Sequence, residues 1–225
     1  MQSLILSIVG LSVLCHLSWA RGCCVPKQWT GDMGFMVGTN RNGKAGYQAG
    51  MVKIFYDARN GKFAEFSKGV VDGRPFEGGV IMDFETGVQY TFMDGHCNTT
   101  RLSQKEFKEA CIPEEAKAVS DTHMGTADDS LDVTVYQMAR KRIGGNSYFT
   151  ITNKLCVPVG ETITGTLPMS GMGYMSTVGY TGIEPGIKDP RVFDKPRICS
   201  SQVEEGFVDL YLKFGFLNHE MSSIF

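Results

Sequence analysis

Residues 47–71, YQAGMVKIFYDARNGKFAEFSKGVV, decide the fold class. On both sides of Asn60-Gly61, apolar residues alternate with polar ones, a period of two that is typical of a β-strand with one buried face. Asn-Gly is favoured in two-residue type I′ turns, because both central residues of that turn have positive φ. The stretch therefore predicts a hairpin of strands 47–57 and 62–71, and Asn42-Gly43 predicts another hairpin turn just before it.

The same alternation recurs along the rest of the chain. Residues 80–84 and 88–93 flank the turn Glu85-Thr86-Gly87 and predict a further hairpin. Extended segments are also expected at residues 131–135, 147–155, 161–167, 172–180 and 208–216. Because we find neither an internal repeat nor a long polar linker, residues 21–225 are expected to form a single domain that is mainly antiparallel β.

One segment carries a helix signal instead. Ser103 and Glu106 have the spacing of a capping box, in which each side chain accepts a hydrogen bond from the other residue's backbone N–H. Phe107 and Cys111 follow at positions i and i+4, which lie on one face of a helix. We therefore expect one or two short helices within residues 103–118.

The first twenty residues have the features of a signal peptide. They carry no charged side chain, contain an apolar run at residues 4–14, and end in Ser18-Trp19-Ala20, with small residues where signal peptidase cleaves. An uncleaved anchor helix is the alternative, but the apolar run is too short to span a bilayer comfortably. Residues 1–20 are thus predicted to be removed and the mature protein to be secreted.

Secretion determines how the cysteines are interpreted. Loss of Cys15 with the signal peptide leaves six of the seven cysteines. An even number in an oxidising compartment predicts three disulfides, and about fifteen connectivities are open to six cysteines. Asn98-Thr99-Thr100 is the one Asn-x-Ser/Thr sequon, and we expect Asn98 to be glycosylated in a surface turn.

Composition and motifs exclude several function classes. With 22 Lys and Arg against 24 Asp and Glu and no basic block, the chain lacks the charge footprint of a nucleic-acid-binding protein. His219-Glu220 has Ser223 where a zinc protease needs a second histidine, and Gly171-x-Gly173 does not continue as a dinucleotide-binding loop. A Gly-x-Ser-x-Gly elbow is also missing. A non-enzymatic protein is therefore expected, and an extracellular hydrolase ranks last.

Calcium is the one cofactor that the residues suggest. Asp128, Asp129 and Asp132 are clustered near a strand start, and Asp121 precedes them. Carboxylate oxygens are the ligands that Ca²⁺ prefers, although the twelve-residue EF-hand loop is absent. A solvated acidic turn explains the same residues without a metal.

Three stretches of the mature chain resemble motifs of a known family. They are residues 23–31 (CCVPKQWTG), residues 154–159 (KLCVPV) and residues 186–193 (GIKDPRVF), the last followed by Cys199. They are similar to the Cys-x-x-Pro-x-Gln-Trp-x-Gly opening, the central Cys-x-Pro-Val motif and the late Gly-Ile-Lys-Asp-Pro block of the ependymin family. The order is the family's own and the stretches span nearly all of the mature chain, so the sequence resembles an invertebrate ependymin-related protein.

The resemblance implies a secreted glycoprotein in which two stacked, curved antiparallel sheets form an open half-barrel around a deep apolar pocket, similar to bacterial lipoprotein carriers. It also implies association with the extracellular matrix, calcium binding and a homodimeric state. By motif, the implied bridges are Cys23–Cys156 and Cys97–Cys199. Cys24 and Cys111 would then pair with each other, which departs from the vertebrate relatives.

A pocket of this kind would be lined by methionine and aromatic side chains, because thioethers repack easily around flexible acyl chains. The candidates for contact with a lipid-like ligand are Met51, Phe84, Tyr90, Phe92, Met172, Tyr174, Met175, Val178 and Tyr180. Each of them is also a candidate for the ordinary core. We therefore expect a carrier or receptor for hydrophobic molecules, with a calcium-binding matrix or adhesion protein as the alternative.

Overall fold

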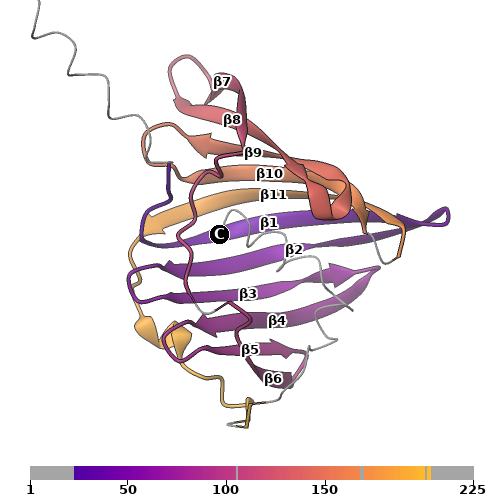
Figure 1. The fold of residues 1–225 in the computed structure, drawn as a ribbon, viewed down its shortest axis with the longest axis vertical. Helices are drawn as coiled ribbons and strands as arrows, with labels where there is room; N and C mark the ends of the chain where they lie inside the picture. Colours follow the sequence, from indigo (N-terminus) through magenta and orange to yellow (C-terminus); the bar gives the residue numbers. More distant parts are fainter. Residues whose placement is uncertain (1–22, 105, 168–169, 201, 204–225) are drawn as a thin grey trace, which may run out of the picture.

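The structure is a computed structural model that describes residues 23–104, 106–167, 170–200 and 202–203. Within this part of the chain, one antiparallel sheet of eleven strands has the order β6-β5-β4-β3-β2-β1-β11-β10-β9-β8-β7 (Figure 1). The strands are β1 (Gln28–Arg41), β2 (Lys44–Asp57), β3 (Lys62–Val71), β4 (Arg74–Asp83), β5 (Val88–Met93), β6 (His96–Arg101), β7 (Lys117–Gly125), β8 (Ser130–Arg140), β9 (Gly145–Thr152), β10 (Pro158–Leu167) and β11 (Met172–Pro185).

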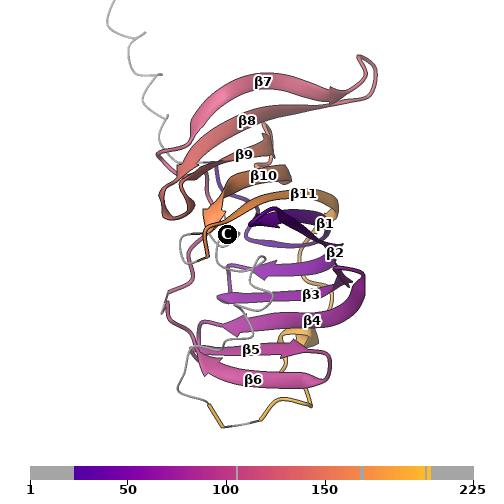
Figure 2. The same ribbon diagram turned by 90° about the vertical axis from the view of Figure 1, so that its right-hand side faces the viewer.

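The expected pair of stacked sheets is wrong. Strands β1 to β6 form one run of hairpins and β7 to β11 form another, and β11 returns to pair with β1. The pairing of β1 with β11 extends from Trp29↔Pro185 to Asn40↔Gly173, so it joins the two runs into one sheet. Both strands are 14 residues long, and their ladder has one register shift, between Thr30 and Asp32. Figure 2 shows the eleven strands following one another from β7 to β6.

Most of the predicted extended segments are confirmed. Residues 131–135 lie in β8, 161–167 in β10 and 172–180 in β11, while β9 ends at Thr152, three residues earlier than expected. Strands β6 and β7 were not predicted. The expected strand 208–216 and the expected signal peptide lie outside the described residues.

Two-residue hairpin turns connect several of these strands. Asn42 and Gly43 have φ of 52° and 80° between the paired residues Arg41 and Lys44, which confirms the predicted turn. Asp72-Gly73 and Asp94-Gly95 make the same kind of turn after β3 and β5. Asp-Gly is the second strong sequence signal for such turns, so these two turns are also encoded locally.

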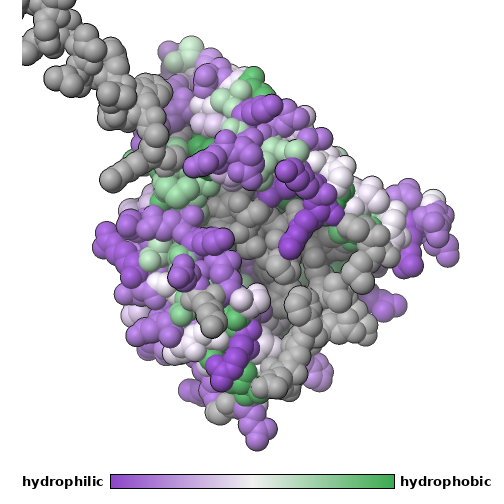
Figure 3. Space-filling view, viewed as in Figure 1, coloured by the Kyte–Doolittle hydropathy of each residue, from purple (hydrophilic) through white to green (hydrophobic). Residues whose placement is uncertain are grey.

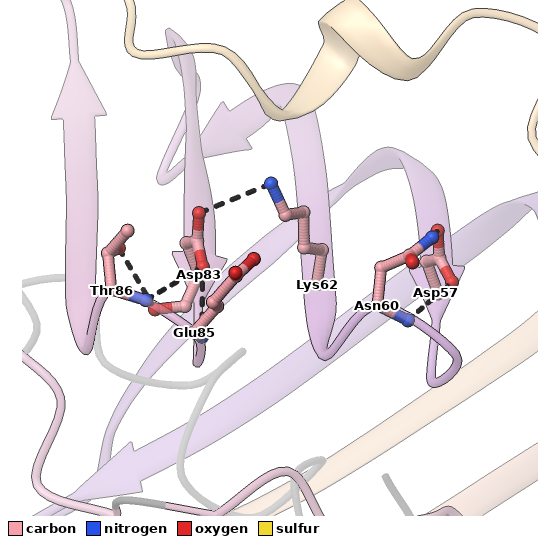
Figure 4. A network of polar contacts seen from close by, with 6 residues as sticks. All are labelled: Asp57, Asn60, Lys62, Asp83, Glu85 and Thr86. Atoms are coloured by element: carbon pink, nitrogen blue, oxygen red, sulfur yellow. Dashed lines mark hydrogen bonds and ion pairs between the residues drawn. The ribbon is translucent and has the colours of Figure 1, made fainter.

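The hairpin at Asn60-Gly61 is confirmed, but its turn is not the predicted one. Asp57 pairs with Lys62, so the loop holds four residues, and of its residues only Gly61 has positive φ (58°). The Asp57 carboxylate accepts hydrogen bonds from the Asn60 backbone N–H (3.1 Å) and Nδ2 (2.7 Å) (Figure 4). An Asx-type closure of this kind competes with the two-residue turn, and here it wins.

The prediction of one or two short helices within residues 103–118 is also wrong. The described residues contain no α-helix, only two short 3₁₀ helices, η1 (Lys141–Ile143) and η2 (Pro190–Phe193). Cys111 instead lies in an isolated antiparallel bridge with Cys24, flanked by backbone hydrogen bonds from Val25 N–H to the Ala110 carbonyl (2.9 Å) and from Ile112 N–H to the Cys23 carbonyl (2.8 Å). These tertiary bonds hold the segment extended, and a helix signal of about nine residues is too short to compete.

Candidate functional site

The two faces of the sheet differ in character. Directly opposed residues of neighbouring strands share a face. Met33 on β1 is opposite Val52 on β2 and Tyr180 on β11, so the three side chains project to the same side of the sheet. We define this as the inner face and the opposite one as the outer face. The inner face carries most of the main buried cluster, which consists of Val25, Trp29, Met33, Phe35, Val37, Val52, Ile54, Tyr56, Phe76, Ala110 and Val178.

Half-buried apolar side chains pack around this cluster. They include Ala58, Phe63, Val71, Met93, Phe107, Tyr180 and Ile183. Phe107, from the extended segment before β7, packs against Tyr56 with ring centroids 5.4 Å apart, and Ala110 N–H donates to the Tyr56 hydroxyl (2.9 Å). This segment therefore covers the end of the inner face where Trp29 and Tyr56 lie.

A buried ion pair interrupts the apolar inner face. Arg140 on β8 donates through Nη2 to Glu161 Oε1 on β10 (2.7 Å), and both side chains are at most 6% exposed. Arg140 Nε donates to Ser147 Oγ on β9 (3.1 Å), so three adjacent strands contribute to the cluster. Two buried charges are tolerated here because each is matched by the other and by further hydrogen bonds.

Tyr180 and Glu65 extend this polar cluster across the inner face. Glu161 is directly opposite Val178, so Tyr180 is its diagonal neighbour on the same face. Glu65 on β3 is buried opposite Ile54 and Val80. Burial raises the pKa of the Tyr180 hydroxyl well above its usual value, and the nearby carboxylates of Glu161 and Glu65 raise that pKa further. Tyr180 is therefore a protonated hydroxyl at neutral pH.

The predicted ligand-contacting residues are divided between the two faces. Register places Met172, Tyr174, Val178 and Tyr180 on the inner face. Tyr174 belongs to a small buried cluster with Ile143 and Ile163, and Val178 belongs to the main cluster.

Of the other five predicted residues, four are on the outer face and Phe84 contacts the segment that covers one end of the inner face. Met51 and Met175 are on the outer face and are 45% and 55% exposed. Phe84 follows β4 and packs edge-on against Phe107 (5.1 Å between centroids). Tyr90 and Phe92 are on the outer face of β5, so they cannot line the same pocket as Tyr180.

Tyr90 and Phe92 instead belong to a separate apolar cluster on the outer face. Its buried members are Ala64, Ile81 and Phe193, with Phe55, Phe66, Tyr90, Phe92, Ile187 and Val192 packed against them. Residues 186–199, which we name the strap, supply Val192 and Phe193 from η2 and Ile187 from the segment just before it. The strap therefore covers the outer face over β2 to β5.

Three disulfides hold these segments in place. Cys23–Cys156, Cys24–Cys111 and Cys97–Cys199 are all formed, as the resemblance implied. Cys97–Cys199 attaches the end of the strap to β6, where the Thr99 hydroxyl also donates to the Ser200 carbonyl (2.9 Å). The third bridge, Cys24–Cys111, attaches the segment before β7 to the N-terminal end of the described chain.

The predicted calcium ligands are not brought together. Asp121 is paired with Thr134 and Asp132 with His123, whereas Asp128 and Asp129 are in the turn between β7 and β8. Asp121 accepts a hydrogen bond from the Thr134 hydroxyl (2.5 Å). Among the described residues, the one group of three side chains with metal-ligating atoms within 4.8 Å of one another is Cys24, Glu109 and Cys111. Its two sulfurs are bonded to each other as a disulfide, so they do not offer thiolates to a metal.

The sequon lies in a strand and not in the expected turn. Asn98 is half-buried in β6, opposite Thr91 of β5. Strand β6 is at the edge of the described sheet, so only one side of its backbone pairs with another described strand. Figure 3 shows hydrophilic residues over most of the described surface on the side seen in Figure 1, with hydrophobic residues in small separate groups.

Residues 73–199 match the family Ependymin. This chain belongs to the ependymin family. It is 27% identical over 191 residues to ependymin-related protein 1 of Haliotis asinina, covering 80% of this chain and 90% of that protein. It is 24% identical over 212 residues to ependymin of Notemigonus crysoleucas, covering 88% and 91%. The family resemblance inferred from the three motifs is thereby confirmed.

Solved structures give more distant similarities. An uncharacterized conserved protein from Thermus thermophilus is similar with a TM-score of 0.48 and 3% identity, covering 76% of this chain and 86% of that one. A putative outer membrane lipoprotein-sorting protein domain from Vibrio parahaemolyticus is similar with a TM-score of 0.33 and 7% identity, covering 72% and 88%. In the described part of this ependymin-family chain, no helix has the length and apolarity needed to cross a membrane.

Sequence reasoning missed the polar residues of the inner face. Glu65 is two positions from Phe63 and Ser67, and Glu161 is two positions from Ile163, so each glutamate shares the inward face of an amphipathic strand. A charged residue at a position that the alternation assigns to the core is the signal that could have identified them.

Proposed function

We propose that this ependymin-family protein is a secreted, non-enzymatic carrier that binds an apolar, lipid-like molecule against the inner face of its sheet. The observation that supports this best is the continuity of the inner face: β1 and β11 join two halves, and both halves contribute apolar side chains to one surface. Half-buried Met93, Met172 and Tyr180 provide adaptable thioether and aromatic contacts on this face.

The three disulfides support secretion, because such bridges persist in oxidising compartments and compensate for a covering layer that contains little regular structure. A signal peptide at residues 1–20 and glycosylation at Asn98 complete this proposal. Peptide N-glycosidase treatment of protein secreted from cultured cells should lower its apparent mass. Asn98→Gln protein should run at that lower mass without treatment.

Ligand extraction tests the carrier proposal directly. Native mass spectrometry before and after organic extraction should reveal a bound hydrophobic molecule, and the emptied protein should then enhance the fluorescence of the neutral probe N-phenyl-1-naphthylamine. Protein that is repeatedly empty and takes up no probe would exclude a carrier.

Two methionines on one strand provide a matched test of the face. Met172→Gln replaces an inner thioether with an amide of similar size, whereas Met175→Gln does the same on the exposed outer face. We expect the inner variant to weaken probe binding by roughly tenfold, because a desolvated amide without a partner costs about 1–2 kcal/mol. The outer variant should bind as the wild type does, and equal losses would contradict inner-face binding.

Calcium binding, matrix association and a homodimer are expectations that come from the family resemblance, and they form the alternative proposal. Calorimetric titration with millimolar Ca²⁺ distinguishes it from the carrier proposal, since Asp121, Asp128, Asp129 and Asp132 lie on β7, β8 and the turn between them, at the opposite end of the sheet from β3 and β4. Sedimentation velocity of the secreted protein tests the homodimer.

A further inference from the structure

Several hairpins of the described sheet turn at the same end of the strands. Because neighbouring strands are antiparallel, β1, β3, β5 and β8 run in one direction, and the hairpins that follow them all close at that end. Figure 1 shows these closures toward the right-hand side of the sheet. We define the turn rim as these turns together with the residues that pair across them, namely residues 41–44, 71–74, 93–96 and 140–145.

The turn rim carries an excess of exposed positive charge. Its two exposed carboxylates, Asp72 and Asp94, each accept a hydrogen bond from a backbone N–H (2.9 and 3.1 Å). Its exposed cations are more numerous, and none of them forms an ion pair with another described residue. They are Arg41, Lys44, Arg74, Lys141 and Arg142. Because they come from separate turns, the sequence itself shows no basic block.

The other end of the strands is built differently. Its cations Lys27 and Lys62 lie 3.1 Å and 3.3 Å from the carboxylates of Glu109 and Asp83, which neutralise them locally. The whole chain has a formal charge of −2. The excess of cations at the turn rim is therefore a local feature that composition does not reveal.

The spread of the rim cations favours a long, linear partner. They extend from β4 to the turn between β8 and β9, which is six strand spacings of about 4.8 Å, or roughly 30 Å along the sheet. A small anion reaches only one or two cations over such a span. A linear polyanion contacts them together and gains the free energy of releasing its own counterions.

A membrane surface fits the turn rim less well. Basic patches that dock on anionic bilayers are commonly supplemented by apolar side chains that enter the interface. None of the large apolar side chains that are exposed in the described chain belongs to the turn rim, and the tips of its first two turns are Asn42-Gly43 and Asp72-Gly73. The three disulfides indicate an oxidising, extracellular compartment, where sulfated polysaccharides are abundant linear polyanions.

We propose that the turn rim binds a linear sulfated polysaccharide of the heparan sulfate kind. Sulfate groups spaced along such a chain meet the guanidinium and ammonium groups of successive hairpins, and arginine donates to oxyanions through two parallel N–H groups. The inference rests on the proposed secretion but not on the carrier function, since the rim cations are exposed at the turns and lie apart from the apolar inner face.

Heparin chromatography of the full secreted protein tests the inference. The wild type should be retained on heparin-agarose at about pH 7.4 and 0.15 M NaCl, an ionic strength at which weak surface attractions are largely screened. The variant Arg41→Glu/Lys44→Glu/Arg74→Glu should elute at a NaCl concentration at least about 0.1 M lower, because three contacts become repulsive. Wild-type protein that passes through the column would overturn the inference without affecting the carrier proposal.

A matched variant separates the turn rim from net charge. Arg59→Glu/Lys108→Glu/Lys154→Glu makes the same change of charge with exposed cations at the other end of the strands, and it should shift elution less than half as far. Equal shifts would overturn the assignment to the rim, as would co-sedimentation with phosphatidylserine vesicles by a wild type that heparin does not retain. Urea midpoints check that the variants fold, and glutamine replaces glutamate at the rim if the charge reversals do not.

Discussion

The outer face of the sheet is covered at one end and bare at its centre. Over β2 to β5, the strap buries Ala64 and Ile81 beneath Phe193 and is attached to β6 by Cys97–Cys199. Over β1, β2, β9 and β11, large apolar side chains are exposed, namely Met36, Tyr47, Met51, Tyr148 and Met175. The strands of both regions alternate in the same way, so alternation alone does not bury a residue. A covering segment does.

The bare centre differs in composition as well as in cover. Between its methionines and tyrosines, the outer face carries small or hydroxyl-bearing residues such as Gly38, Thr162 and Thr177. Exposed apolar residues separated by threonine and glycine are common on protein surfaces, whereas the clustered rings of Phe55, Phe66 and Phe92 are not. Phe66 packs with Phe55 and Phe92 at centroid distances of 5.9 Å, which accounts for the strap being held over them.

Removing the disulfide of the strap should have the largest effect on this contrast. In Cys97→Ser/Cys199→Ser protein, the unfolded state gains the freedom of a loop with a sequence separation of 102, so the free energy of unfolding should fall by about 3–5 kcal/mol. Urea denaturation under non-reducing conditions measures the loss, and 8-anilinonaphthalene-1-sulfonate fluorescence should report the newly exposed rings. A loss below about 1 kcal/mol without dye binding would show that the strap stays in place unaided.

Truncating one anchor of the strap should have the next largest effect. Phe193 is 7% exposed, and Phe193→Ala should lower the free energy of unfolding by about 3 kcal/mol through lost burial and the cavity left behind. The matched change at the bare centre, Met175→Ala, should lie within about 0.5 kcal/mol of the wild type. Thermal and urea unfolding measure both variants, and similar losses would erase the distinction between the two regions.

Two ion pairs, one in each region, provide the comparison with the smallest expected effect on stability. Lys62–Asp83 (3.3 Å), at the covered end, joins side chains that are 29% and 15% exposed, and Asp83 also accepts from the backbone N–H groups of Glu85 and Thr86 (Figure 4). Lys53–Asp32 (3.0 Å) joins side chains that are 45% and 40% exposed.

Because solvent screens the more exposed pair, Lys62→Met should cost about 1 kcal/mol and Lys53→Met at most about 0.5 kcal/mol. Urea midpoints at low and high salt measure the difference. A larger loss for Lys53→Met than for Lys62→Met would contradict the expectation that the less exposed pair is the stronger one. Losses that do not change with salt would contradict it as well.

Strand positions were predictable from sequence where the local signal and the tertiary structure agree. Asn42-Gly43 closes a two-residue turn as expected, since Arg41 and Lys44 pair directly. Asn60-Gly61 has the same signal but a different turn, because the Asp57 side chain offers a competing closure. The helix expected at residues 103–111 failed for a similar reason, since its cysteine bonds to a residue 87 positions away.

The candidate site was predictable only in part. Met172 and Met175 are indistinguishable by composition, yet they project to opposite faces because three positions separate them on a strand. Tyr90 and Phe92 alternate as well as Tyr174 does, but the strap covers their side of the sheet. Glu65 and Glu161 are visible in the sequence as charged residues at positions that the alternation assigns to the core. Only the strand pairing that runs from β3 to β10 shows that both project to the same face of the sheet.

The sequence by itself determined the β class, most strand positions, the family and the six cysteines that form bridges. Period, turn chemistry and motif order are properties of neighbouring residues and need no knowledge of the rest of the chain. Only the tertiary structure decided that the strands form one sheet, which face is inner, and which apolar residues are covered. Those outcomes depend on contacts between residues a hundred or more positions apart, such as Cys97 with Cys199 and Met33 with Tyr180, and local patterning carries no information about them.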